Sequence, residues 1–344
     1  MAYTTINKST DHFNTKLYTG NGSTNAITGV GFEPDMCWWK MRSGTEEHAL
    51  GDAVRGAGYI VKPNAADAQA QSASYFASFD SDGFTLGSDT KTNGNSSTYA
   101  SWNWKAGTTS GISAGSQTIT PSAYSINTTA GFGIYKWSRT GASTTDYFSH
   151  GLGATPTIAI QKRTDGVQDW YVNTTVIDGT NDNLHLNKTD VKEDDSTTVP
   201  TSTNYYPKSP ETGDYITYLF TPKQGFSKFG SYKGSGNADG PFLYCGFKPA
   251  FIILKNTVDG AKNWEMLDNR RPSTGQNPAD DILFPDTSGP ESSSQTDRLV
   301  DFVSNGVKIR GNSAQMNGNG NTFIYMAFAE APLVGTNNVP ANAR

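Results

Sequence analysis

Residues 246–255 read Gly-Phe-Lys-Pro-Ala-Phe-Ile-Ile-Leu-Lys, in which a glycine and a proline precede five apolar residues and a lysine. The same spacing of Gly, Pro and Lys occurs at residues 31–40 and again at residues 153–162. Each run between Pro and Lys has the length and the apolar character of a buried β-strand. Three copies of one strand signature predict an internal repeat, and this repeat decides the fold.

Each copy also ends with a similar strand, at residues 98–104, 214–220 and 322–328. Alternate positions of these strands are apolar, and a strand period of two puts them on one face. We therefore expect this face to pack on the core. Its residues are Ala100, Trp102 and Trp104 in the first copy, Ile216, Tyr218 and Phe220 in the second, and Ile324, Met326 and Phe328 in the third.

The repeats are about 100 residues long, which exceeds a propeller blade or a solenoid repeat and suits an autonomous sandwich. The sequence thus predicts an all-β fold of three tandem jelly-roll-like (concanavalin-like) β-sandwich modules. We place the modules at residues 10–107, 128–222 and 223–334. The remaining segments are an N-terminal arm at 1–9, a Gly/Ser/Thr-rich linker at 108–127 and a C-terminal tail at 335–344.

The composition supports a β protein with many turns, since charged residues make up 17% and hydrophobic residues 35% of the chain. The 27 basic and 32 acidic residues give a net charge of −5, which provides no basic surface for a nucleic acid. No apolar run reaches the roughly 18 residues that span a bilayer, and the first residues lack the features of a signal peptide. We expect synthesis in a cytosol, without membrane insertion and without a nucleic-acid partner.

Residues with catalytic or metal-binding potential form no known pattern. Cys37 and Cys245 stand at different places in their repeats, so we expect two buried, reduced thiols rather than a disulfide. Nucleophile elbows, phosphate-binding loops and dinucleotide fingerprints are absent from the sequence. Four histidines lack metal-ligand spacing and are expected on the surface or in turns. They are His12, His48, His150 and His185. We predict no catalytic residues, no metal and no cofactor, and hence no enzyme.

Two acidic pairs, Asp80/Asp82 and Asp194/Asp195, have in principle the chemistry for calcium binding or glycoside hydrolysis. The internal repeat places Asn305 where Asp82 stands, however, so the two copies share only a turn before glycine. We interpret Asp82 as a turn residue and residues 192–196 as a solvated loop. Residues 65–74 are interpreted as an insertion in the first copy that could form a short helix.

Tryptophans are the remaining candidates for a binding site, because exposed aromatic rings stack on sugars. Most of the seven lie within strand signatures and are expected in the core. Trp39, Trp170 and Trp264 have polar neighbours in sequence, and we single them out as candidates for stacking on a glycan.

Several motifs resemble the repeat modules of uncharacterised virion structural proteins of tailed phages, particularly marine and cyanobacterial ones. They are the Gly-Phe-x-Pro signature with its strand, the loop at 317–320 (Asn-Gly-Asn-Gly), the run Tyr-Met-Ala-Phe-Ala-Glu-Ala-Pro at 325–332 and the tail Asn-Asn-Val-Pro-Ala-Asn-Ala-Arg at 337–344. The resemblance covers nearly the whole chain. The second copy departs from it at residues 153–155 and by lacking the Asn-Gly loop.

This resemblance implies an external virion component, either tail fibre, spike or head decoration, that is synthesised in the cytoplasm of the host bacterium and acts through contacts with other virion proteins. A symmetric homo-oligomer would then be expected. Binding to a host-surface glycan is an option that the sequence leaves open. The alternative, from a different class, is a carbohydrate-binding protein without a virion role, and a glycan-cleaving enzyme is a third hypothesis.

Overall fold

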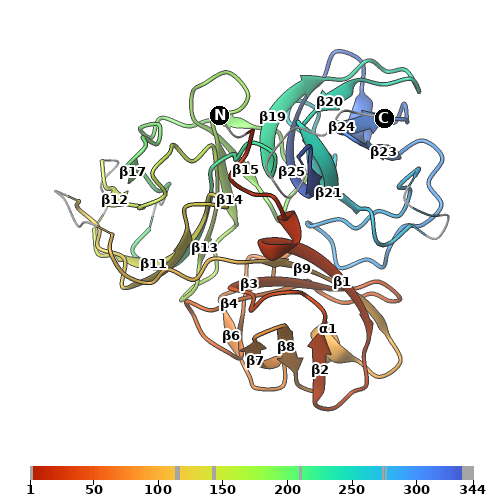
Figure 1. The fold of residues 1–344 in the computed structure, drawn as a ribbon. Coiled ribbons are helices and arrows are strands. Elements are labelled where there is room, and N and C mark those ends of the chain that lie inside the picture. The colour runs from red at the N-terminus through yellow and green to blue at the C-terminus, as the bar shows by residue number, and fades with distance from the viewer. Residues whose placement is uncertain are drawn as a thin grey trace.

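The chain folds into three lobes of antiparallel β-sheet that surround a common centre (Figure 1). The computed structural model describes residues 3–112, 117–141, 145–208, 211–272, 275 and 277–334. We call the lobes unit 1 (residues 9–112), unit 2 (residues 117–221) and unit 3 (residues 222–334). The all-β class predicted from the sequence is confirmed.

Unit 1 has a four-stranded sheet with the order β1-β9-β3-β4 and a three-stranded sheet with the order β2-β8-β7. The two sheets meet through side chains such as Trp39 and Phe84, whose ring centroids lie 5.4 Å apart. The elements are η1 (Ser9–Asp11), β1 (Phe13–Thr19), β2 (Asn25–Thr28), β3 (Met36–Met41), β4 (Ala49–Asp52), β5 (Tyr59–Ile60), β6 (Ala70–Gln71), β7 (Phe76–Asp80), β8 (Gly83–Leu86), α1 (Thr90–Asn93) and β9 (Thr98–Trp104).

Unit 3 repeats this topology, with a large sheet of order β19-β25-β21-β22 and a small sheet of order β20-β24-β23. A helical turn again precedes the closing strand, and its N-cap Ser313 accepts from the N–H of Gln315 as Asp89 does from Lys91 in unit 1. The elements are β19 (Ser227–Lys233), β20 (Phe242–Tyr244), β21 (Phe247–Asn256), β22 (Trp264–Asp268), β23 (Val300–Val303), β24 (Gly306–Ile309), α2 (Ala314–Asn317) and β25 (Thr322–Pro332).

Unit 2 keeps the central order β11-β18-β13-β14 and extends it to seven strands with β10, β15 and β16. The strand pair β12-β17 covers it. The elements are β10 (Ala123–Asn127), β11 (Phe132–Arg139), β12 (Phe148–Ser149), β13 (Ile158–Arg163), β14 (Tyr171–Thr174), β15 (Asp182–His185), β16 (Glu193–Asp194), β17 (Asn204–Tyr205) and β18 (Gly213–Phe220). Strand β10 lies inside the stretch that the sequence predicts to be a linker. This part of the stretch forms a strand instead, because the alternating Tyr124 and Ile126 pack on the core of unit 2.

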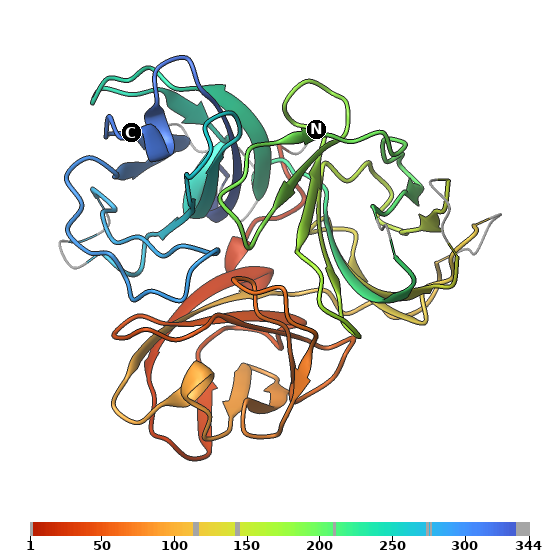
Figure 2. The same cartoon turned by 180° about the vertical axis from the view of Figure 1, so that it is seen from behind.

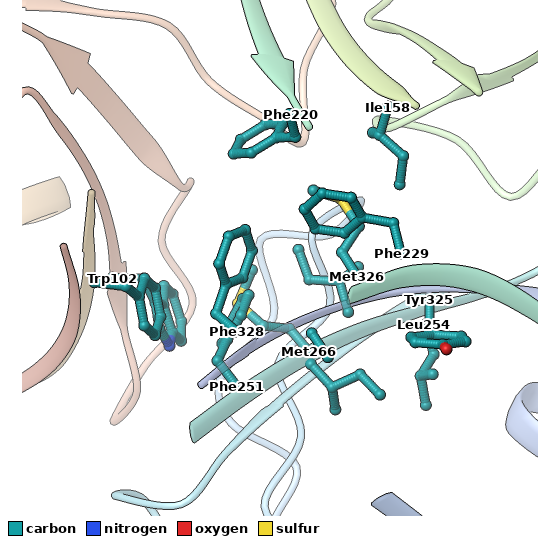
Figure 3. Packing of buried hydrophobic residues seen from close by; sticks show 14 of the residues in the cluster. Trp102, Ile158, Phe220, Phe229, Phe251, Leu254, Met266, Tyr325, Met326 and Phe328 are labelled. Carbon is teal, nitrogen blue, oxygen red and sulfur yellow. The ribbon is translucent and has the colours of Figure 1, made fainter. Parts of the chain in front are cut away.

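The three large sheets turn one face each toward the centre of the molecule. Phe328 of β25 lies 5.2 Å from Phe13 of unit 1 and 5.9 Å from Phe220 of unit 2, measured between ring centroids. Figure 3 shows Phe220, Trp102 and Phe328 converging from the three units. The cavity left between the sheets measures only about 10 Å³, so the centre is closely packed.

The closing strands contribute the apolar face that the sequence predicted, and every residue of that face is buried. Its position is different from the one expected. Trp102, Phe220 and Met326 belong to the cluster shared by all three units, whereas the inner core of unit 1 is formed from the opposite face, with Cys37 and Trp39. The units are therefore joined by a common core rather than folded as autonomous sandwiches.

Burial on both faces explains why the strands after each Gly-x-x-Pro signature read as continuous apolar runs. In β3, all six residues are buried: Met36 and Trp38 face the centre, while Cys37 and Trp39 face the small sheet. Strands covered on both sides lose the alternation of apolar and polar residues. The turn at each Gly-x-x-Pro signature immediately precedes a strand that is covered on both faces.

Figure 2 shows the same three lobes from behind, with the N-terminal arm passing between units 2 and 3. The arm bonds to unit 3, because the Tyr3 hydroxyl donates to the carbonyl of Gly246 at 2.8 Å and the Thr4 hydroxyl donates to Gln224 at 2.6 Å. Ile6 joins the common core. The arm is thus part of the packed structure from Tyr3 onward.

We predict that Phe328→Ala lowers the free energy of unfolding by about 3–5 kcal/mol, because it removes a buried ring that contacts all three units. Urea unfolding followed by tryptophan fluorescence measures the change. Val167→Ala, at a side chain that is 72% exposed, is the control and is expected to change stability by less than about 0.5 kcal/mol. A loss of under about 1 kcal/mol for Phe328→Ala would contradict a shared core.

Candidate functional site

The three tryptophans predicted as sugar-stacking residues are buried, with exposed fractions of 0% for Trp39, 0% for Trp170 and 2% for Trp264. Trp39 lies inside unit 1 between the small and large sheets, and its ring centroid is 5.1 Å from that of Phe76. A buried ring offers no face to a ligand. The prediction of a glycan platform at these residues is therefore wrong.

Trp170 and Trp264 lie at the joints between units, which explains their polar neighbours. The Trp170 indole N–H donates to the carbonyl of Lys62 in unit 1 at 2.8 Å. The Trp264 indole N–H donates to the carbonyl of His185 in unit 2 at 2.9 Å. The polar residues around them belong to a buried seam and not to a solvent-exposed surface.

His48 takes the same place in unit 1. The pairing of β3 with β4 ends at Trp39 and Ala49, and one further step of the same register places His48 beside Lys40, as Trp264 stands opposite Lys255 in unit 3. Its Nε2 lies 3.0 Å from the carbonyl of Phe284 in unit 3, and its Nδ1 accepts from the Trp38 indole at 2.9 Å. The ring is therefore the neutral tautomer with the proton on Nε2. Burial lowers the His48 pKa well below its usual value, and the prediction of a surface or turn role is wrong for this histidine.

These three contacts close a head-to-tail ring, in which unit 1 donates to unit 3, unit 3 to unit 2 and unit 2 to unit 1. Each accepting segment has the same length, and its last residue returns a main-chain hydrogen bond to the donating unit. The segments are residues 62–69, 185–192 and 284–291. The return bonds run from Gln69 N–H to Thr164 at 3.0 Å, from Lys192 N–H to Thr257 at 2.8 Å and from Glu291 N–H to Arg42 at 3.0 Å.

This equivalence corrects two sequence interpretations. Residues 65–69 are not an insertion peculiar to the first copy, because they lie in the accepting segment that every unit has, and no helix forms there. Lys192 is the last residue of another such segment. Of the predicted solvated loop at 192–196, Glu193 and Asp194 are exposed as expected, while the Lys192 main chain belongs to a joint.

The lysine of each repeat signature is fully buried, and two of the three lysines donate across a joint. Lys162 Nζ donates to the carbonyls of Ala66 in unit 1 at 3.0 Å and of Gln168 in its own unit at 2.8 Å. Lys40 Nζ likewise donates to Met41 at 2.9 Å and to Ser288 of unit 3 at 3.2 Å. Burial lowers the pKa of Lys40, of Lys162 and of Lys255 to about 8.

Two joints also contain a buried aspartate–arginine pair that the sequence analysis missed. In unit 1, Asp52 accepts from Arg55 Nε at 2.6 Å, and the Tyr218 hydroxyl of unit 2 donates to the same carboxylate at 2.7 Å. In unit 3, Asp268 accepts from Arg271 Nε at 2.6 Å and from the Trp102 indole of unit 1 at 3.0 Å. The signal was the spacing Asp-x-x-Arg at residues 52–55 and 268–271.

The joint between units 3 and 2 differs from the other two. Cross-strand pairing puts Met326 at the position of Tyr218 and Trp102, and Thr174 at the position of the two aspartates. Neither residue is charged, so this joint lacks the ionic pair that the other two have at these positions. The joint between units 1 and 3, in contrast, adds Glu291, which pairs with both Arg42 and Arg271 at 2.7 Å.

The other histidines and the acidic pairs have local structural partners. His150 is buried, so a surface position is wrong for this residue, while its Nδ1 accepts from the Leu152 N–H two residues further on at 3.1 Å, as in a turn. Asp82 accepts from the N–H groups of Gly29 at 2.9 Å and Gly31 at 2.7 Å, consistent with the predicted turn role. Asp195 accepts from Asn173 at 2.7 Å.

His12 and His185 are only partly buried, and burial lowers the pKa of each. Both predicted free thiols are buried, and burial raises the pKa of Cys37 and that of Cys245. Among the described residues, no group of three or more His, Cys, Asp or Glu side chains is placed to hold a metal ion. Within that same part of the chain, no helix has the length and apolarity to cross a membrane.

An exposed aromatic pair stands on the edge strand β20 of unit 3. Phe242 is 45% and Tyr244 58% exposed, whereas Leu243 between them is buried. The corresponding residues of β2 in unit 1 are Ala26 and Thr28. Thr28 stands opposite the glycine that begins the neighbouring strand β8, and Tyr244 stands opposite the glycine that begins β24. This pair breaks the repeat at the surface, and it is the candidate functional site of the molecule. The sequence signal for this site is the alignment of Phe-Leu-Tyr in unit 3 with Ala-Ile-Thr in unit 1, where two aromatic residues replace small ones.

We predict that Tyr218→Phe lowers the free energy of unfolding by about 1–2 kcal/mol, because Asp52 loses a buried hydrogen bond across a joint. Chemical denaturation measures the loss. The control is Tyr59→Phe, since the Tyr59 hydroxyl makes no hydrogen bond to another described residue. Equal stability of the two variants would show that the hydroxyl does not hold the joint.

The buried lysines predict a pH dependence of stability. Their pKa falls from 10.5 to about 8 on folding, so at these groups the unfolded chain binds more protons between these values, and the lysines' contribution to stability rises with pH across that window. We expect the free energy of unfolding to rise less steeply from about pH 8 to 9.5 in Lys162→Met than in the wild type. Identical slopes in parallel denaturation series would contradict this assignment.

Comparison with known proteins places the chain in one family. Searches of the curated proteins and of the solved structures return no significant match. A family model matches residues 8–332, a span that runs through all three units and stops at the end of β25. The chain belongs to the family described as a domain of unknown function, DUF7483.

Proposed function

We propose that the protein is an external structural component of a tailed-phage virion, a tail fibre, spike or head decoration, that acts through protein–protein contacts. The placement on a virion rests on the sequence resemblance. The structural role is supported by one observation above all, the common aromatic core that ties three units into a single block.

The geometry suits a part that has to hold its shape. Large sheets buried on both faces and joints closed by hydrogen bonds leave little freedom for one unit to move against another. The small sheets β2-β8-β7 and β20-β24-β23 and the pair β12-β17 then lie on the outside of the block. Three outward surfaces on a stiff frame can contact several neighbours in an assembly.

The finer fold belongs to the same proposal. In units 1 and 3 a large and a small antiparallel sheet enclose an inner core, and in unit 2 the strands β12 and β17 take the place of the small sheet. This arrangement supports three jelly-roll-like β-sandwich modules. In each module, the face of the large sheet that turns toward the centre of the molecule would have diverged from that of an independent sandwich, because it acquired the shared core.

A carbohydrate-binding protein is the second candidate, and the exposed pair Phe242 and Tyr244 favours it. Two rings on one face of a strand could stack on neighbouring sugar units. The tryptophans named in the sequence analysis no longer support this function. The candidate now depends on unit 3 alone.

The test compares purified virions with the isolated protein. We expect mass spectrometry to find the chain at a fixed stoichiometry in particles, and immunogold electron microscopy to place it on their outside. Intact particles that lack the chain would contradict the proposal. A specific signal on a glycan array, lost in Phe242→Ala/Tyr244→Thr, combined with absence from particles would establish the second candidate instead.

A further inference from the structure

The edge strand β20 has an open side. Its pairing partner is β24, with Leu243 opposite Val307, and β20 ends the order of its sheet. The flanking bonds, from Ile309 N–H to Pro241 and from Cys245 N–H to Asn305, show that odd-numbered residues of β20 bond to β24. In an antiparallel ladder the residues between them point their N–H and C=O groups the other way. Phe242 and Tyr244 thus present two donors and two acceptors along the free edge of the described sheet.

The side chains beside this free edge are those of the exposed aromatic pair. A Cβ added at Gly306 would lie 2.9 Å from the Phe242 ring, so the ring lies over this glycine. The Tyr3 hydroxyl, which donates to Gly246, lies beside the Tyr244 hydroxyl. An open edge with apolar side chains is a ready site for pairing with another strand, and natural proteins usually protect such edges.

Unit 1 shows what a protected edge looks like in the same fold. The corresponding strand β2 carries Ala26 and Thr28, and the outer face of its sheet adds Thr85 and Asp80, which hydrogen-bond to each other at 2.7 Å. Small and polar side chains there give a second strand little to pack on. The aromatic residues of β20 are therefore not required by the fold.

We propose that two copies of this chain associate through their β20 strands, which pair antiparallel across a twofold axis. With Leu243 on the axis, Phe242 of each copy stands opposite Tyr244 of the other, and four main-chain hydrogen bonds join the edges. The two three-stranded sheets become one sheet of six strands. This inference rests on strand geometry and stands whether or not the chain belongs to a virion.

The occupant is a second copy because the edge is complementary to itself. Antiparallel pairing brings each aromatic ring against the other type, and cross-strand aromatic pairs stabilise sheets.

The expected association is weak, because two three-residue edges bury less area than the roughly 1,200 Å² of a standard interface. Sedimentation equilibrium of the full chain from about 1 µM to about 1 mM measures it. We expect a monomer–dimer equilibrium without higher species. A wild-type chain that stays monomeric over this range overturns the proposal.

The decisive variant is Phe242→Ala/Tyr244→Thr, which gives β20 the residues that β2 carries and leaves the core unchanged. We expect dimerisation at least about tenfold weaker, at an unchanged melting temperature. Val167→Thr removes an exposed apolar side chain elsewhere and is expected to dimerise as the wild type does. Dimerisation that persists in the double variant overturns the proposal.

A second comparison separates strand pairing from contact between rings alone. Tyr244→Pro removes the outward N–H that β24 does not use, whereas Tyr244→Ala keeps it. We expect the proline variant to dimerise about tenfold more weakly than the alanine variant, because two intermolecular hydrogen bonds are lost. Equal dimerisation of two folded variants overturns strand pairing. If the proline variant does not fold, the double variant alone decides.

Discussion

The inner faces of three β-sheets have to be covered by one another, and the rest of the structure follows from this constraint. None of these faces is covered by its own small sheet, so each unit exposes large aromatic side chains unless the other two are present. Phe328 illustrates the dependence, because its ring contacts rings from all three units. Burial of this centre requires that the three units close into a ring.

Closure of the ring also buries main-chain carbonyl groups, and the joints between units supply their hydrogen-bond donors. The accepting segments press their main-chain carbonyls into the rim of an apolar centre, where an unpaired carbonyl is costly. Trp170, Trp264 and His48 supply ring N–H donors to these carbonyls, and Lys40 and Lys162 supply ammonium groups. The signature lysine is therefore explained by the joints and not by a role at the surface.

The sequence predicted the strands, the all-β class and the turn at Asp82, because these depend on local periodicity and on turn chemistry. It also predicted that Trp102 and Phe220 are buried. A period of two identifies a buried face but does not say what covers it, so the shared core was not foreseen. Trp170 and Trp264 were misjudged because polar neighbours can belong to a buried seam.

The candidate site was missed for a different reason. Comparison of the copies was used to remove candidates that repeat, such as Asp82 with Asn305, whereas Phe242 and Tyr244 are informative because they do not repeat. His48 was hidden in the opposite way, since a histidine stands where the other copies have tryptophan and the shared task is visible only in the hydrogen bonds. An alignment of the copies compares residue types. The joints require only a ring N–H donor at a given position, and histidine and tryptophan both supply one.

The aromatic edge of β20 belongs to unit 3 and is absent from the corresponding strand β2 of unit 1, although the three units are joined head to tail in the same way. Had the same ring been built from three identical chains, every feature of one unit would appear three times, and a self-complementary edge would have a valence of three. Such a particle would link to three neighbours and grow into a network. By carrying its three copies in one polypeptide, the protein has a valence of one at this edge, so that pairing terminates at two molecules.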